Sequence, residues 1–314
     1  MSYFFKRVLS SVPILLIASI IIFGLIHITP GDAAFHAAGG LSATQEDIEA
    51  ARDRLGLDRP VHVQYLDWAG RAIQGDLGTS LFSSRTVTNA ILDRLPVTVG
   101  IALGALVFAS LVAFPLGIAA ALKADSTVDR VVTTIASLGI ATPEYFLGLI
   151  LVLVFALRLD LLPATGYVSI AENPADWLRH IALPSIALGG AVTAELTRHV
   201  RASLRDVLSR DYVLTAFGKG LPTFSVIFKH AMKNAAIPVV TVFGLQARRL
   251  LGGTVVVEQV FGLRGLGHLA VHSVFSRDIP MIQGVTLVTV VIVVLVNLLV
   301  DLSYLYFNPR VRDV

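Results

Sequence analysis

Five charged residues lie inside long apolar stretches of the chain, where an ionised side chain is costly unless it meets water or a partner. They are Glu144, Glu195, Arg248, Arg249 and Asp301. We interpret Arg248 and Arg249 as candidates to line a polar path that attracts an anionic group such as a carboxylate, with Glu195 and Glu144 as further candidates. The alternative is structural: the two arginines would form ion pairs with Glu195, Asp301 or a partner protein.

A second group that could do chemistry comprises His268, His272 and Asp278. The two histidines are four residues apart, so they would share one face of a helix, and imidazole suits nickel. No H-E-x-x-H pattern accompanies them. A nickel site is the alternative for these residues, and we predict no metal site.

Signatures of catalysis and nucleotide binding are absent from the sequence. The nearest fragment to a phosphate-binding G-x-x-x-x-G-K-[ST] loop is Gly218-Lys219, but Gly220 follows it and Val213 occupies the position of the first glycine. No Gly-x-Ser-x-Gly occurs, and the absence of cysteine excludes disulfides and thiol nucleophiles. The protein is thus predicted to be non-enzymatic and to hold no cofactor of its own.

The segment 211–238 is predicted to form a helix, a tight turn and a second helix. Apolar residues recur at helical spacing in its first part, and Gly218, Gly220 and Pro222 then interrupt the pattern. Thr223 can cap the second helix. Glycines allow a sharp turn and a close approach to another protein.

Basic residues follow this turn, and with Lys219 they make one side of the segment positive: Lys219, Lys229, His230 and Lys233. A positive loop between membrane spans is what membrane orientation alone would produce. The other interpretation is that this basic side is a binding surface for a separate protein.

The composition is that of an integral membrane protein, with 55% apolar and 15% charged residues. A net charge of only +3 argues against a nucleic-acid partner, so membrane lipid is the expected surroundings. Apolar runs predict six spans, at residues 8–28, 98–122, 131–157, 181–196, 237–257 and 281–307. A cleaved signal peptide is the alternative for the first run, but its apolar length exceeds a usual signal sequence.

Two local features are expected to shape the spans. Prolines within or beside them predict kinks, at Pro115, Pro143 and Pro184. Gly100 and Gly104 form a GxxxG pair suited to close helix packing.

Residues 29–95 contain nine acidic residues and no lysine, which predicts a polar cap, with a helix starting near residues 44–46. Every lysine falls in the set of segments that includes the N-terminus, the 123–130 loop and the 198–236 loop. Lysine and arginine favour the cytoplasmic side, so both termini and the 211–238 segment are predicted to be cytoplasmic and the cap extracytoplasmic.

Several motifs occur in an order that matches a known family along nearly all of the chain. They are Pro30-Gly31-Asp32, LGLDRPVHVQYLDW (55–68), GDLGTSL (75–81), Arg94-Leu95-Pro96, TPEYFLGL (142–149), LLPATGY (161–167), VFGLRGLGHLAVHSVFSRDIPMIQG (260–284) and NLLVDLSYLYFNPRVR (297–312). Each alone is weak, but together they are specific. The chain resembles the first permease subunit of dipeptide, oligopeptide or nickel ABC importers.

The resemblance implies an all-α polytopic membrane protein of the type I ABC importer kind, with six transmembrane helices and an extracytoplasmic cap between the first two. The implied domains are an N-terminal transmembrane helix (1–28), the cap (29–95), an importer transmembrane domain (96–308) and a cytoplasmic tail (309–314). The 200–236 loop would be the family's EAA-type coupling loop. The position of Glu-Ala-Ala is taken by Leu214, Thr215 and Ala216.

The residues implied to couple the spans to an ATPase surround Gly220, the central glycine of that loop. They are Asp211, Tyr212, Thr215, Ala216, Gly218, Lys219, Gly220, Leu221, Pro222, Thr223, His230, Asn234 and Pro238. Arg248, Arg249, Glu195 and Glu144 would then be translocation path candidates.

The resemblance further implies a location in the bacterial plasma (inner) membrane and four kinds of partner. These are a second homologous permease, two cytoplasmic ATPase domains that hold the ATP and magnesium, an extracytoplasmic substrate-binding protein, and lipid. Short peptides are the expected cargo, with nickel or glutathione-like cargo as alternatives. A different class, an ion-gradient-driven secondary transporter, would require internal inverted repeats that the sequence does not show.

Overall fold

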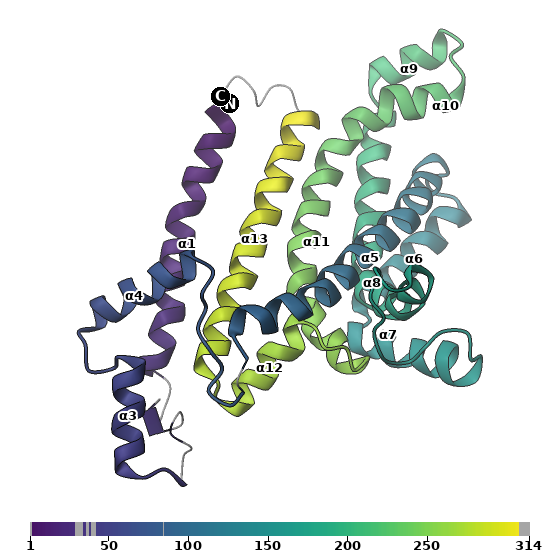
Figure 1. Ribbon diagram of the computed structural model, residues 1–314. Coiled ribbons are helices and arrows are strands. Elements are labelled where there is room, and N and C mark those ends of the chain that lie inside the picture. Colours follow the sequence, from purple (N-terminus) through teal and green to yellow (C-terminus); the bar gives the residue numbers. More distant parts are fainter. Residues whose placement is uncertain (1, 29–33, 36–37, 39–41, 84, 308–314) are drawn as a thin grey trace. The chain divides into compact units, whose positions relative to one another are not determined.

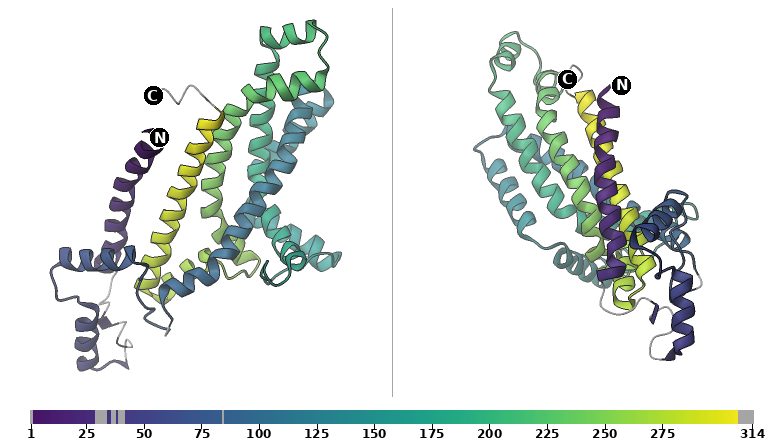
Figure 2. Two further views of the ribbon diagram at one scale, coloured as in Figure 1. Left: turned by 45° about the horizontal axis from the view of Figure 1, so that its top comes forward. Right: turned by 90° about the vertical axis from the view of Figure 1, so that its left-hand side faces the viewer.

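The computed structural model describes residues 2–28, 34–35, 38, 42–83 and 85–307, and the described chain is built from helices (Figures 1 and 2). In order they are α1 (Ser2–Ile28), α3 (Gln45–Leu55), α4 (Val61–Ile73), α5 (Val87–Leu122), α6 (Thr127–Ala141), α7 (Glu144–Leu151), the π-helix η2 (Val152–Arg158), α8 (Pro174–Leu208), α9 (Asp211–Gly218), α10 (Thr223–Ser225), the π-helix η3 (Val226–Ala231), α11 (Met232–Val260), α12 (Leu266–Ser276) and α13 (Ile279–Phe307). The predicted all-α fold class is confirmed.

Within the described residues, three helices are long and apolar enough to cross a membrane: Arg7–His27, Val87–Leu122 and Ile279–Ser303. Two bent helix pairs raise the number to five if each pair is one span. The fourth predicted span, 181–196, lies in α8, which is not among these. Its 35 residues include charged and polar side chains, and its buried residues, most of them apolar, pack against other helices.

The predicted third span, 131–157, is not one straight helix. It bends by 104° between α6 and the helix that begins at Glu144. Thr142 is extended, with φ −84° and ψ 120°, because the ring of Pro143 clashes with a helical conformation of the preceding residue. The proline therefore ends α6 instead of merely kinking a span.

Two compact units make up the chain: Met1–Phe4 with Val97–Leu263 and Leu295–Val314, and Phe5–Pro96 with Arg264–Val294. In the first unit, α8 packs against α6, α7 and α11. Its buried apolar residues join those of α5 and α11 in one core, whose members include Ile101, Leu183, Leu188, Leu196, Leu250 and Phe261.

In the second unit, α3 begins as the sequence predicts. Thr44 accepts a hydrogen bond from the Asp47 amide, and the Asp47 carboxylate accepts one from the Thr44 amide, so both ends of a capping box are present. Farther along the chain, the buried Asp278 carboxylate accepts hydrogen bonds from the Ser80 hydroxyl at 2.5 Å and the Leu81 amide at 3.2 Å. This contact fixes the loop before α5 to the start of α13.

Glycines on α5 bring it close to α8. A Cβ at Gly104 would lie 2.2 Å from the Ser185 hydroxyl oxygen, whereas one at Gly100 would lie 3.5 Å from the Trp177 ring, an ordinary contact. Of the predicted GxxxG pair, Gly104 is thus the residue that requires a glycine. Gly117, farther along α5, is equally confined against α8.

We expect Gly117→Ala to destabilise the protein by about 1–3 kcal/mol, because overpacking forces backbone shifts. The added methyl group would lie 2.7 Å from the Cβ of Val200 and 2.9 Å from the carbonyl oxygen of Thr197. The measurement is the temperature at which detergent-solubilised protein loses its monodisperse peak, with Gly100→Ala as the matched control. Equal unfolding temperatures for the two variants would contradict the packing argument.

Candidate functional site

The segment 211–238 forms the helix, tight turn and second helix that the sequence predicts (Figure 1, green). Its turn is a Schellman motif: the Gly220 amide donates to the Phe217 carbonyl at 2.9 Å, and the Leu221 amide donates to the Ala216 carbonyl at 3.3 Å. Gly220 has φ +77°, a left-handed conformation that favours glycine. The turn therefore depends on the glycine that the sequence singles out.

The second helix begins differently from the prediction. Thr223 is the first residue of α10 and does not cap it, because Pro222 occupies the N-cap position and no side chain bonds to the exposed amides. Proline fixes the backbone geometry that leads into the helix. The helix then continues through the π-helix η3 into α11.

The inner face of the segment is buried against the ends of α5 and α8. Its residues Val213, Ala216, Val226 and Ala231 share a cluster with residues of α5 and α8, among them Ala121, Leu204 and Val207. Two hydrogen bonds reinforce this packing: Asn234 Nδ2 donates to the Tyr212 hydroxyl at 2.8 Å, and the Ser203 hydroxyl donates to the Ala235 carbonyl at 2.8 Å. The segment is thus fastened to α8 and α11.

The outer face of the segment exposes apolar side chains. Phe224 and Phe228 are 73% and 49% exposed, with ring centroids 4.5 Å apart. The other large apolar residues on this face are Leu214, Phe217 and Leu221, and Lys219, Lys229 and Lys233 are exposed beside them. An exposed aromatic pair in a basic surround suits a protein partner with an apolar groove and an acidic rim.

Sequence reasoning missed Phe224 and Phe228 as site residues. The available signal was their spacing of four residues directly after the turn, which places both rings on one helix face. Of the predicted coupling residues, Ala216 is buried and supports the fold, while Thr215 donates its hydroxyl proton to the Asp211 carbonyl.

The remaining predicted coupling residues lie on the same short run of chain. Most are exposed or half-buried: Tyr212, Gly218, Lys219, Leu221, Pro222, Thr223, His230 and Asn234. Pro238 lies where the chain bends by 56° between Thr223–Ala236 and Pro238–Leu250. The structure thus brings the predicted set together, and their contact with an ATPase stays a prediction.

The candidate path residues occupy facing helices of the first unit. Arg249 Nη1 on α11 lies 4.0 Å from Glu195 Oε2 on α8, and these side chains are 67% and 35% exposed. The Glu144 carboxylate of α7 approaches α11 at Gly253, where it would lie 2.9 Å from an added Cβ. Arg248, in contrast, donates to the Gly244 carbonyl of its own helix at 3.4 Å.

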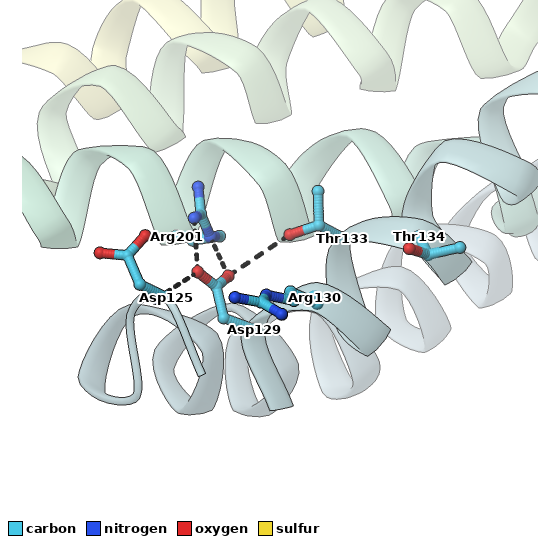
Figure 3. Close-up of a pocket in the computed structure, with 6 residues that line it drawn as sticks. All are labelled: Asp125, Asp129, Arg130, Thr133, Thr134 and Arg201. Atoms are coloured by element: carbon cyan, nitrogen blue, oxygen red, sulfur yellow. Dashed lines mark hydrogen bonds and ion pairs between the residues drawn. The ribbon is translucent and has the colours of Figure 1, made fainter. Parts of the chain in front are cut away.

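A polar site between α6 and α8 was not predicted from the sequence (Figure 3). The buried Asp129 carboxylate accepts two hydrogen bonds from the Arg201 guanidinium, one of them 2.6 Å from Nη2 to Oδ2, and Asp125 pairs with Arg205 at 2.8 Å. A cavity of about 350 Å³ adjoins these pairs, lined by Asp125, Asp129, Arg130, Thr133, Thr134 and Arg201. Matching four-residue spacings of the two acids and the two arginines were the signal in the sequence.

His268 and His272 do not form a metal centre with Asp278. In the described part of the chain, no three histidine or carboxylate side chains are grouped to hold a metal ion. The Asp278 carboxylate is engaged by Ser80 and Leu81 instead. Burial is the main cause that lowers the pKa of His268, which favours its neutral ring.

Comparison with known proteins assigns the family. The sequence model of the family "binding-protein-dependent transport system inner membrane component" matches residues 113–313, and the model of the N-terminal part of such membrane components matches residues 1–102. The chain belongs to this family of permeases.

Curated relatives of the permease align with it along nearly its whole length. It is 41% identical over 312 residues to the glutathione transport system permease protein GsiC of Salmonella choleraesuis (strain SC-B67), covering 99% of both chains. It is 42% identical over 312 residues to the protein of the same name from Escherichia coli (strain K12), again covering 99% of both chains. The recognition of an ABC importer permease, a multi-pass protein of the inner membrane, is thereby confirmed.

We expect Gly220→Ala to loosen the turn of this permease, because a side chain in the left-handed region costs about 1–2 kcal/mol. Amide hydrogen exchange across 211–231 should accelerate by roughly 5- to 30-fold. The control is Gly218→Ala, which has equally open space but a helical backbone and should leave exchange unchanged or slow it. Similar exchange in both variants would show that the left-handed geometry does not hold the turn.

Proposed function

We propose that this permease forms one membrane half of an ATP-driven importer that moves short peptides, glutathione included, into the cytoplasm. The observation that carries the proposal is the two-faced 211–238 segment, whose inner face is buried on α5 and α8 and whose outer face is apolar, aromatic and basic. The segment lies between the long helices α8 and α11. A surface in this position could pass a movement of a bound partner protein to both helices.

In the proposed mechanism, the outer face seats in a groove on a cytoplasmic ATPase subunit. Phe224 and Phe228 are the apolar anchors of this contact, and the lysines beside them pair with acidic groups at the rim. When two ATPases close on ATP, the segment moves, and its packed inner face carries the ends of α8 and α11 with it. ATP binding thus shifts the population between two packings of the spans.

The permease would work with a second homologous permease, two ATPase domains and an external substrate-binding protein. The ATPases supply ATP hydrolysis and hold magnesium, so this chain acts as a non-catalytic subunit. The placement of lysines supports cytoplasmic termini and a cytoplasmic 211–238 segment.

Arg249 supports a peptide-like cargo. Its side chain is 67% exposed in this chain although it lies on a largely apolar helix, and Glu195 is its acidic neighbour. Glutathione and short peptides carry both carboxylates and an ammonium group, which an arginine and a glutamate on facing helices complement. The relatives named as glutathione transport permeases agree with this cargo class.

The function is tested by uptake into vesicles that contain the whole complex. Labelled glutathione, a dipeptide and nickel are supplied separately, with ATP, without ATP, and with a proton or sodium gradient. We expect ATP-dependent uptake of glutathione or the dipeptide, and its loss in the Phe224→Ser/Phe228→Ser variant as the ATPases dissociate. Phe275→Ala removes an aromatic ring that is 85% exposed and lies outside the segment, and it should keep uptake.

Two other results would overturn the proposal in different ways. Uptake that persists without ATPases and follows the ion gradient would make the protein a secondary transporter. ATP-driven uptake of nickel alone would support the coupling to ATPases and would show that the cargo is nickel and not a peptide.

The path role of Arg249 has its own test. We expect Arg249→Leu to lower glutathione uptake by about tenfold, the effect of losing one hydrogen bond to a charged group, while ATPase binding stays normal. Arg249→Lys keeps the charge and should restore part of the uptake. Loss of assembly in Arg249→Leu would instead assign Arg249 to a structural pair with Glu195.

A further inference from the structure

The helix α4 of the second unit runs across α1 (Figures 1 and 2). It contacts α1 through aromatic side chains. The Tyr65 and Trp68 rings lie 5.6 and 5.9 Å from the ring of Phe23, centroid to centroid. The Tyr65 hydroxyl also shares a 2.9 Å hydrogen bond with the Ser19 hydroxyl. One face of α4 is therefore fixed to α1.

A second face of α4 is polar and carries the chain that enters this helix. Gln64 Nε2 donates to the carbonyls of Leu57 and Arg59, and Asp67 forms an ion pair with Arg59 at 3.0 Å. Arg71 follows Asp67 by one turn on the same side. The polar face thus points toward the α3–α4 connection.

The third face is exposed in this chain and is apolar over its last two turns, with His62 at its first turn, four residues before Leu66. Leu66 is 65% and Ile73 is 87% exposed, and Ala69 and Gly70 lie between them on the helix surface. The two large residues are seven apart, so they share a face that differs from that of Asp67 and Arg71. Exposing such a face to water would be unfavourable.

The depth of α4 follows from where it touches α1. The apolar span of α1 runs from Arg7 to His27, and the contacts with α4 are at Ser19 and Phe23, inside that span. At 1.5 Å per residue, these contacts lie about 6–12 Å before the end of the span. Amphipathic helices that lie in the membrane plane bury their apolar face about 5–10 Å into the boundary between headgroups and acyl chains. The depth of the α1 contacts with α4 agrees with this value.

The neighbouring surface of α1 is open in the same region. Ile20 and Ile21 are 50% and 63% exposed beside the contact residues, as expected of a lipid-facing span. Tyr65 and Trp68 are the residue types that favour the membrane interface.

We propose that α4 lies in the plane of the membrane, in the leaflet that the C-terminal half of α1 crosses, with Leu66 and Ile73 in contact with acyl chains. The connection to α3 emerges on the water side, because Gln64, Asp67 and Arg71 face that way. The helix would hold the polar region between α1 and α5 against the bilayer. The proposed contact of α4 with acyl chains does not depend on which side of the membrane the termini occupy.

The chain contains no cysteine, so single cysteines can be introduced and spin-labelled without background. The full complex is reconstituted into phosphatidylcholine–phosphatidylglycerol nanodiscs with a label at Leu66→Cys, Ile73→Cys, Asp67→Cys or Arg71→Cys. Collisions with oxygen, which concentrates in hydrocarbon, are compared with collisions with chromium oxalate, which stays in water. Ile17→Cys on α1 and Glu49→Cys on α3 serve as the membrane and water references, since both positions are exposed.

We expect positions 66 and 73 to resemble the reference on α1, with a high ratio of oxygen to chromium oxalate collisions, and positions 67 and 71 to resemble the reference on α3. A water-like ratio at all four positions would overturn the proposal. Low collision rates with both reagents at 66 and 73 would also overturn it, because the face would then be covered by another protein.

Discussion

The close packing of α8 against its neighbours is the constraint on which the first unit depends. In hydrocarbon, apolar side chains gain little from leaving lipid, so helices associate mainly through tight contact and hydrogen bonds. Gly104 and Gly117 of α5 and Gly189 of α8 allow such contact, since a Cβ at any of them would overlap the facing helix. Once α8 is fixed in this way, its last turns present the surface on which α9 rests.

Polar groups at the helix contacts are satisfied in pairs, as burial requires. Thr98 donates its hydroxyl proton to the fully buried Glu258 carboxylate at 2.6 Å, which ties α5 to α11. Asp129 and Arg201 form the corresponding link between α6 and α8. Removing one member of such a pair would leave a buried charge, so these pairs specify which helices lie together more than they add stability.

Local signals in the sequence predicted local structure well. The predicted helix start near residues 44–46 agrees with the start of α3 at Gln45, and the predicted turn at Gly220 follows α9, because both features depend on residues adjacent in the chain. Pro143 was recognised as the site of a kink, but the size of the bend, 104°, was not predicted, because it depends on how the next helix, α7, packs against α8. The pairing of Asp129 with Arg201 joins residues 72 positions apart, so the matching four-residue spacings hint at a pair without showing that α6 and α8 lie side by side.

The aromatic pair shows a different limit of sequence reasoning. In a helix with apolar residues on two sides, spacing alone does not reveal which side faces the protein. Val226 and Ala231 lie on the inner side, in one buried cluster with Leu204, and Phe224 and Phe228 lie on the exposed side. The same ordering explains how the proposed coupling could work. A buried inner face of small residues resists sliding because protein interiors are close-packed, whereas large outer rings offer area to a partner; in the proposed mechanism, a force on the rings would therefore be passed to α8 and α11.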